Sequence, residues 1–242
     1  DLLTGDFRLV TMHNNFNDPA EFRMVSFSDD GSDIYYISNM NSDFYRLSKY
    51  DISNGNIVNL KIPVLKGYEF RDISRVVFSN DKTRMLIQIN DEGYDRLFMY
   101  DLINNSEITI PRQLKSTSVT ALAFSNDDKK IIIGINSAAN PSVLYEWDIN
   151  SRSVVQVTYP VLAGVDPASF VEPELINYTT FDSLKIPAFV YLPKNSTGKN
   201  IPCIVSIHGG PEGQATYGFA PIYQYLLNAG YAIIEPNVRG ST

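Results

Sequence analysis

The sequence predicts an all-β region built from repeated sheet units, followed by the opening of a mixed α/β sheet. Two observations support this order. Short strand-like segments separated by polar turns repeat over most of the chain with a period of about 50 residues. The pattern of the last part of the chain instead predicts strands followed by a helix and a further strand. With 44% hydrophobic residues among 242, the chain has the apolar content of a globular protein with a packed core.

Two sequence markers define the repeat. The first is a strand that ends in Phe, followed by a turn of Ser, Asn and Asp residues and an apolar strand. The second is a strand that ends in an aromatic residue and Asp, followed by a polar turn and a short strand. The markers lie at Phe27, Phe78 and Phe124 and at Tyr50, Tyr100 and Trp147. Four short strands per repeat at this period are typical of a β-propeller blade.

The first ten residues repeat the second marker, because residues 1–10 align with residues 51–60 and Gly5 then matches Gly55. We therefore predict a partial propeller over residues 1–158, made of the tail of one blade and three full blades over residues 12–158. A closed ring has roughly four to eight blades, so this ring is incomplete. Residues 159–174 are predicted to be a linker.

Residues 175–242 predict the first strands and helix of an α/β-hydrolase fold. Two strands are joined by a turn at Asp182 and Ser183, and an apolar run over 201–207 predicts a strand buried on both faces. Apolar residues then follow at helical spacing, and Gly230 occupies the position of a helix C′ glycine. The run 231–238 predicts the next strand. The apolar residues of the helix are Ile222, Tyr225, Leu226 and Ala229.

A His-Gly-Gly-Pro turn follows the apolar run 201–207. Gly209 and Gly210 permit backbone angles and close approaches that a Cβ would forbid. Backbone N–H groups in such a turn can bind an anion, and α/β-hydrolases use a turn of this kind for an oxyanion. A purely structural turn is the alternative, in which His208 is a hydrogen-bonded residue at the end of a strand.

Three segments carry a resemblance to a known family: "VEPELINYTTFDSLKIPAFVYLP", "SIHGGPEGQ" and "GYAIIEPNVRGST". Over residues 171–242 they resemble the start of the catalytic domain in the prolyl oligopeptidase family of serine peptidases, most closely its acylaminoacyl-peptidase branch. The resemblance implies that Gly210 supplies an oxyanion-hole N–H, with Gly209 and His208 supporting the loop. It also implies short peptide substrates and a propeller that screens the active site from large folded proteins.

The sequence contains no Gly-x-Ser-x-Gly motif, which this fold uses for its nucleophile. The resemblance places the triad serine, aspartate and histidine beyond Thr242, and neither His208 nor His13 fits the last position in that chain order. We therefore predict that the chain is a fragment that is inactive by itself. Two alternatives stay open: an esterase on the same scaffold, and a propeller binding module without catalysis. The Trp147-Asp148 pair suggests the second, although the repeat is longer than in WD40 propellers.

Other residues have two interpretations. Arg239 is interpreted as a paired structural arginine rather than a substrate contact, since an unpaired buried cation is costly. Glu212 is interpreted as a solvated carboxylate rather than a ligand for a peptide amine. Cys203 is interpreted as an inert core thiol. Five aspartates suggest either calcium or turn chemistry, and their recurrence at one blade position favours turns, so we expect neither metal nor cofactor. They are Asp29, Asp30, Asp81, Asp127 and Asp128.

Composition excludes some partners. A net charge of −7 and a pI of about 4.8 argue against nucleic acid, which needs a basic surface. No apolar run reaches the 18 or so residues of a membrane span. One cysteine cannot form an internal disulfide, so we expect a cytoplasmic protein. The sequence does not indicate an oligomeric state.

Overall fold

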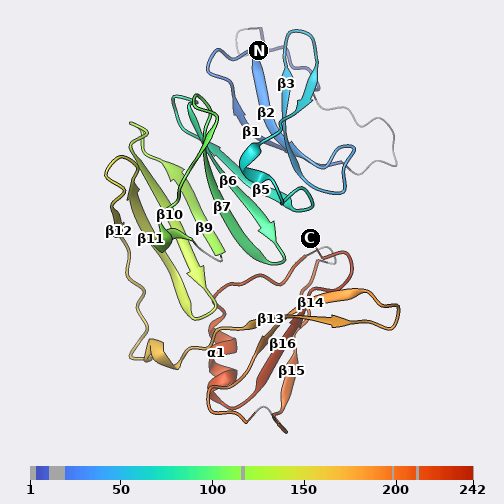
Figure 1. The fold of residues 1–242 in the computed structure, drawn as a ribbon, viewed down its shortest axis with the longest axis vertical. Coiled ribbons are helices and arrows are strands. Elements are labelled where there is room, and N and C mark those ends of the chain that lie inside the picture. Colours follow the sequence, from blue (N-terminus) through green and yellow to red (C-terminus); the bar gives the residue numbers. More distant parts are fainter. Residues whose placement is uncertain (1–3, 11–19, 116–117, 198, 211–212, 242) are drawn as a thin grey trace. The chain divides into compact units, whose positions relative to one another are not determined.

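The computed structural model describes residues 4–10, 20–115, 118–197, 199–210 and 213–241. Its first part contains three four-stranded antiparallel sheets (Figure 1). The first sheet consists of β1 (Phe22–Phe27), β2 (Asp33–Ser38), β3 (Arg46–Asp51) and β4 (Ile57–Asn59). The second consists of β5 (Asp72–Phe78), β6 (Arg84–Asp91), β7 (Tyr94–Asp101) and β8 (Ser106–Ile108). The third consists of β9 (Ser118–Phe124), β10 (Lys130–Ser137), β11 (Asn140–Asp148) and β12 (Val154–Gln156).

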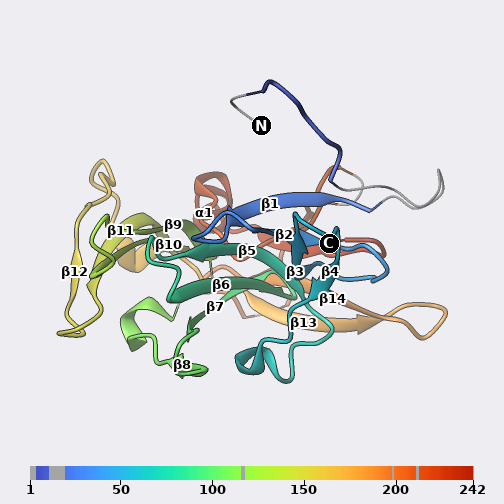
Figure 2. The ribbon, with the colours of Figure 1, turned by 90° about the horizontal axis from the view of Figure 1, so that it is seen from above.

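These sheets confirm the predicted blades in the described part of residues 12–158. The first marker ends the first strand of each sheet, and the second ends the third strand. Each sheet keeps its four strands in sequence order, which Figure 2 shows for β5, β6 and β7. The only helical elements in the described chain between residues 20 and 155 are two 3₁₀ turns, η1 (Pro63–Leu65) and η2 (Arg112–Leu114). Residues 5–10 form no strand, so the tail of an earlier blade stays a prediction.

The polar turns of the blades repeat in atomic detail. In the second blade Ser79 Oγ donates to Asp81 Oδ1 at 2.7 Å, and Arg84 N–H donates to Ser79 Oγ at 2.9 Å. Ser28 and Ser125 make the corresponding bonds in the other two blades. A left-handed residue occupies the same turn position each time. These residues are Gly31, Lys82 and Asp128, with φ of 70°, 55° and 55°. Asp30, Asp81 and Asp127 therefore cap turns through local hydrogen bonds.

The fourth sheet is mixed and has the order β13-β14-β16-β15. It contains β13 (Glu174–Thr179), β14 (Lys185–Tyr191), β15 (Cys203–Val205) and β16 (Ala232–Pro236), and a third 3₁₀ turn, η3 (Pro167–Ser169), precedes it. The helix α1 (Pro221–Asn228) connects β15 to β16, which run parallel. Gly230 follows this helix with φ of 92°, as expected of a C′ glycine. The predicted order of hydrolase elements is therefore confirmed.

The prediction for the strand at 201–207 was wrong in one respect. β15 spans three residues and lies at the edge of the sheet, where it pairs only with β16. Val205 is 59% exposed and Cys203 is exposed, so Cys203 is not a core thiol. An apolar run indicates a capacity for burial, but burial on both faces needs a second covering element. The described residues provide none at this edge.

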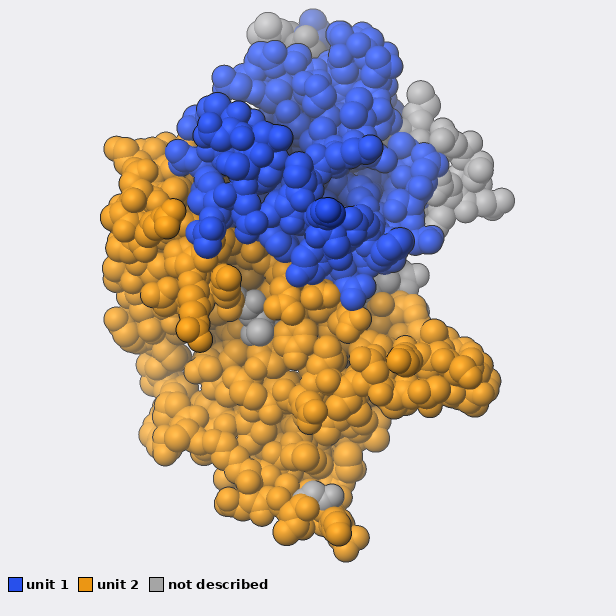
Figure 3. Space-filling view, viewed as in Figure 1, with its two compact units in different colours: residues 1–90, 98–109 blue, residues 91–97, 110–242 orange. Residues whose placement is uncertain are grey.

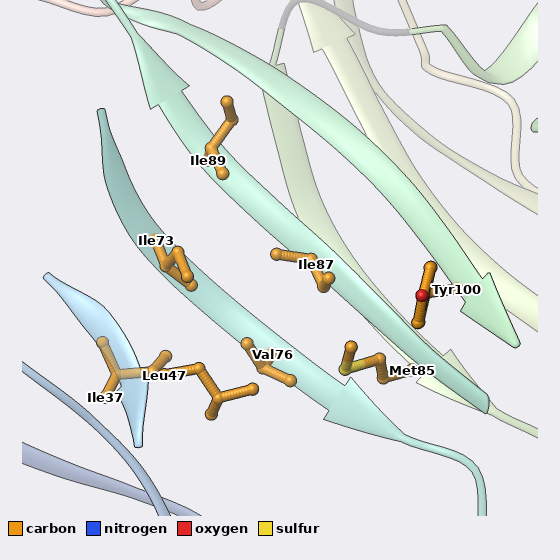
Figure 4. Packing of buried hydrophobic residues seen from close by; sticks show 8 residues of the cluster. All are labelled: Ile37, Leu47, Ile73, Val76, Met85, Ile87, Ile89 and Tyr100. Atoms are coloured by element: carbon orange, nitrogen blue, oxygen red, sulfur yellow. The ribbon is translucent and has the colours of Figure 1, made fainter. Parts of the chain in front are cut away.

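Packing divides the chain into two units, Asp1–Asn90 with Phe98–Thr109, and Asp91–Leu97 with Ile110–Thr242 (Figure 3). The core of the first unit joins the first two blades (Figure 4). It consists of Ile37, Leu47, Ile73, Val76, Met85, Ile87, Ile89 and Tyr100. The predicted domain limits at 158 and 175 stay predictions.

The core of the second unit lies between α1 and the fourth sheet and also includes residues from the blades. Phe189, Tyr191 and Ile233 are its fully buried centre, and Leu227 of α1 is buried against them. Ala138 from the third blade belongs to the same cluster, and Tyr94 packs against it, with its ring centroid 5.4 Å from that of Phe189.

Candidate functional site

Two polar loops begin at the carboxyl ends of two neighbouring strands of the fourth sheet. The strands β15 and β16 lie side by side (Figure 1) and run parallel, with Val205 opposite Ile234 in the register. Because neighbouring parallel strands point the same way, the loops that follow them begin side by side at the same end of the strands. We name them the HGG loop, residues 206–215, and the NVRGS loop, residues 237–241. The sequence analysis identified the first as a site, and the sheet topology adds the second.

His208 connects the two loops. Its Nε2 lies 2.7 Å from Ser241 Oγ, and its Nδ1 lies 3.1 Å from the Gly209 carbonyl oxygen. A carbonyl oxygen only accepts hydrogen bonds, so Nδ1 carries the proton and Nε2 accepts from the Ser241 hydroxyl. His208 is therefore hydrogen-bonded through both ring nitrogens.

Gly210 has a conformation that favours glycine. Its φ is 118°, which lies in the region that L side chains rarely adopt. Its N–H donates to no acceptor among the described residues. Gly209 has a negative or extended φ, and a Cβ built there would meet no atom within 4 Å. The oxyanion role of Gly210 stays a prediction. Pro211 and Glu212 lie outside the described residues.

Gly213 lies close to Gly209 in the HGG loop. A Cβ on Gly213 would collide with the Gly209 carbonyl oxygen, so this close approach requires a glycine. Two residues later, Ala215 is held by the buried side chain of Asn237, whose Oδ1 accepts from Ala215 N–H at 2.7 Å. The NVRGS loop thus contacts the HGG loop at both ends.

A carboxylate and phenol cluster lies beside the start of the HGG loop. Tyr223 OH donates to Glu235 Oε1 at 2.5 Å and lies 2.6 Å from Ser206 Oγ. Burial raises the pKa of Glu235, although hydrogen bonds from Tyr223 and Tyr191 act in the opposite direction. Burial, with a further contribution from the Glu235 hydrogen bond, raises the pKa of Tyr223 to about 12.

Arg239 is ion-paired, as the sequence interpretation favoured. Its Nη2 lies 2.5 Å from Asp182 Oδ1 and 3.3 Å from Thr180 Oγ1, and its guanidinium lies 5.5 Å from the centre of the Phe181 ring. The side chain is 48% exposed, so the pair is not the buried one that the interpretation assumed. Exposed ion pairs contribute little stability, and this pair links the NVRGS loop to the β13–β14 turn.

Sequence reasoning missed Asn237, Ser241, Glu235 and Tyr223. The signal for Glu235, Asn237 and Ser241 was the polar segment "EPNVRGS" at the end of an apolar strand. Tyr223 lies in α1 and had no such signal. Once the two strands are known to be parallel neighbours, the two polar segments must meet. The sequence does not state which strands are neighbours.

Within the described ranges, no group of three or more His, Cys, Asp or Glu side chains is placed to hold a metal ion. No helix among the same residues is long and apolar enough to cross a membrane.

Comparison with known proteins shows what this chain is similar to. No family model matches the chain. A curated relative, dipeptidyl aminopeptidase BIII of Pseudoxanthomonas mexicana, is 26% identical over 123 residues, which are 48% of this chain and 18% of the relative. The chain therefore spans about a fifth of that protein.

Solved structures show the fold. Prolyl oligopeptidase B of Galerina marginata matches with a TM-score of 0.79 and 17% identity over 98% of this chain and 32% of that one. The acylaminoacyl peptidase of Pyrococcus horikoshii matches with a TM-score of 0.65 and 21% identity over 88% and 32%. The relatives and structural neighbours of this chain are thus peptidases of the prolyl oligopeptidase, dipeptidyl peptidase and acylaminoacyl peptidase type. The resemblance and the fold class inferred from the sequence are confirmed.

Proposed function

We propose that this chain is part of a serine peptidase that cleaves short peptides by Ser-His-Asp acyl transfer. The observation that carries the proposal is Gly210, a glycine with φ of 118° whose N–H has no acceptor among the described residues. It lies in a loop that follows a sheet strand, where α/β-hydrolases place an oxyanion donor. A curated relative named as a dipeptidyl aminopeptidase supports the peptide substrate class.

In this mechanism a serine oxygen attacks the peptide carbonyl carbon and the serine proton passes to the triad histidine. The carbonyl oxygen becomes an anion that accepts hydrogen bonds from Gly210 N–H and from the amide after the serine. The C–N bond then breaks, and the amine leaves with the proton. Water releases the acyl group by the same steps. The three triad residues would lie outside this sequence, which has no Gly-x-Ser-x-Gly.

The test uses the full-length protein that contains this chain. It is treated with a fluorophosphonate probe and assayed with Ala, Ala-Ala and N-acetyl-Ala p-nitroanilides and with p-nitrophenyl acetate. Labelling of a serine together with anilide hydrolysis is expected. Hydrolysis of the ester alone would favour the esterase. A protein that is neither labelled nor active would favour the binding module and contradict the proposal.

The 242-residue chain by itself should not react with the probe. Ser241 is the serine to examine, because its hydroxyl already donates to His208. Labelling that disappears in Ser241→Ala would place a nucleophile inside this chain and would contradict the proposed origin of the triad.

Gly210→Pro in the full-length protein removes the proposed donor. We expect turnover to fall about 100- to 1000-fold, the usual effect of losing one oxyanion donor. The melting temperature serves as the control for folding. Near-normal turnover in a folded variant would contradict the role of Gly210.

A further inference from the structure

Asn237 is an almost completely buried side chain, 3% exposed, in the NVRGS loop. Its amide oxygen accepts from Ala215 N–H at 2.7 Å, and its amide nitrogen donates to the Ala215 carbonyl at 3.0 Å. Its own backbone N–H donates to the Pro187 carbonyl at 2.8 Å, which fixes Asn237 to β14. The oxygen and the nitrogen of the Asn237 amide therefore both hydrogen-bond the backbone of one residue, Ala215, in the HGG loop.

The HGG loop is also fixed at its other end, where His208 Nε2 accepts from Ser241 Oγ at 2.7 Å. One five-residue segment thus anchors residues 208 and 215. Between these anchors lie three glycines, which by themselves would allow many backbone conformations. The direction of the Gly210 N–H consequently depends on the two anchors.

We propose that Asn237 is a positioning residue that fixes the Gly210 N–H for the oxyanion, an inference that rests on the proposed function. An oxyanion donor accelerates the reaction because it is in place before charge develops. Asn237 touches neither substrate nor reacting atoms. It acts through Ala215 and the loop, with Ser241 as the second anchor.

The chemistry of the contact requires an amide. Alanine at position 237 would leave the Ala215 N–H and carbonyl without partners in a buried place. Aspartate would still accept from the N–H, but it has no donor for the carbonyl and would place a carboxylate oxygen against it. Both changes release the loop at one end.

Gln224 offers a matched control, because it makes the same kind of contact elsewhere. This side chain of α1 is 7% exposed. Its Oε1 accepts from Val171 N–H at 2.8 Å and its Nε2 donates to the Val171 carbonyl at 2.9 Å. Its Nε2 also donates to the Ala138 carbonyl at 2.8 Å. Gln224→Ala therefore removes a buried amide contact at least as extensive as that of Asn237, without releasing the HGG loop.

The experiment compares Asn237→Ala, Asn237→Asp and Gln224→Ala in the full-length protein. Melting temperature, kcat and KM for the anilide that wild type cleaves best, and the fluorophosphonate rate constant are measured. In the probe reaction the serine oxygen bonds to phosphorus, fluoride leaves, and the serine proton passes to the histidine. We expect both Asn237 variants to lower kcat and the probe rate constant at least tenfold, about the effect of a partly lost donor, with KM within about twofold. Gln224→Ala should lower the melting temperature similarly and keep kcat within about twofold.

Equal kcat in folded Asn237→Ala and Gln224→Ala would overturn the positioning role. If Asn237→Ala does not fold, Ser241→Ala decides, since it releases the other anchor at a part-buried site. A tenfold lower kcat in Ser241→Ala would support the anchoring of the loop, and an unchanged kcat would overturn it. A wild-type protein that is neither labelled nor active would contradict the proposed function. This result differs from those that contradict the positioning role of Asn237, so the two failures can be distinguished.

Discussion

At the residue scale, the strongest constraints fall on residues whose Cβ position is already occupied by neighbouring atoms. Gly93 is one such residue, at the turn between β6 and β7. It has φ of 89°, and a Cβ there would lie 2.8 Å from the Ala215 carbonyl oxygen and 2.9 Å from Phe189 Cε2. Its carbonyl accepts from Tyr217 N–H at 2.9 Å. The position therefore excludes a side chain for both conformational and steric reasons.

Gly93→Ala should cost more than the conformational penalty alone, which is about 1–2 kcal/mol for a left-handed L-residue. Gly31→Ala is the matched control, because Gly31 has φ of 70° and no atom within 4 Å of its Cβ position. Thermal unfolding of both variants measures how much more stability Gly93→Ala loses than Gly31→Ala. Equal costs would show that the surroundings of Gly93 yield without penalty.

Glu235→Gln should change how stability depends on pH. Because burial raises the pKa of Glu235 in the folded state, the unfolded chain loses this proton first, and the folded state loses stability as pH rises above about 4.5. Glutamine keeps an acceptor for Tyr223 and does not titrate. The melting temperature of Glu235→Gln relative to wild type should thus increase from pH 4 to pH 8.

A melting-temperature difference between Glu235→Gln and wild type that stays constant from pH 4 to pH 8 would contradict the raised pKa of Glu235.

At the element scale, the blades were predictable and the edge strand was not. Each blade turn is determined by residues within six positions, such as Ser79, Asp81 and Arg84, so the pattern is visible in the sequence. The burial of β15 depends on which strands lie beside it, and the contact between Asn237 and Ala215 depends on β15 and β16 being parallel neighbours. Such information is not local, so the sequence identified the HGG loop but not its anchors.

Ser79→Ala tests the blade turn. Ser79 is completely buried, and its hydroxyl bonds Asp81, the Arg84 carbonyl and the Arg84 N–H. Its loss should cost about 1–3 kcal/mol, because the hydrogen bonds of one buried hydroxyl are lost together. Ser28→Ala removes the corresponding bonds at a more exposed position and should cost less in thermal unfolding. Equal losses would mean that burial does not set the cost.

At the scale of the whole molecule, the 242-residue chain exposes an apolar sheet edge. Val205 is 59% exposed and Ile207, just beyond β15, is 67% exposed. Unpaired edges of this kind favour association between chains.

Val205→Lys should therefore reduce self-association of the 242-residue chain, measured by light scattering over a concentration series. Val161→Lys is the control, because Val161 is 93% exposed but belongs to no strand. An equal reduction by both variants would indicate a general charge effect instead of a blocked edge.

The contact between the Gly93 turn and Tyr217 also has a consequence for biosynthesis. Roughly 120 residues separate the two, and a ribosome adding about 5–20 residues per second needs roughly 6–25 s to make them. Tyr94 packs on Phe189 and Tyr217 in the finished chain, so it has neither partner until residue 189 is made and lacks Tyr217 until residue 217 is made. The second blade is thus synthesised well before the residues that cover its Tyr94 ring, and that ring stays uncovered while the chain between them is made.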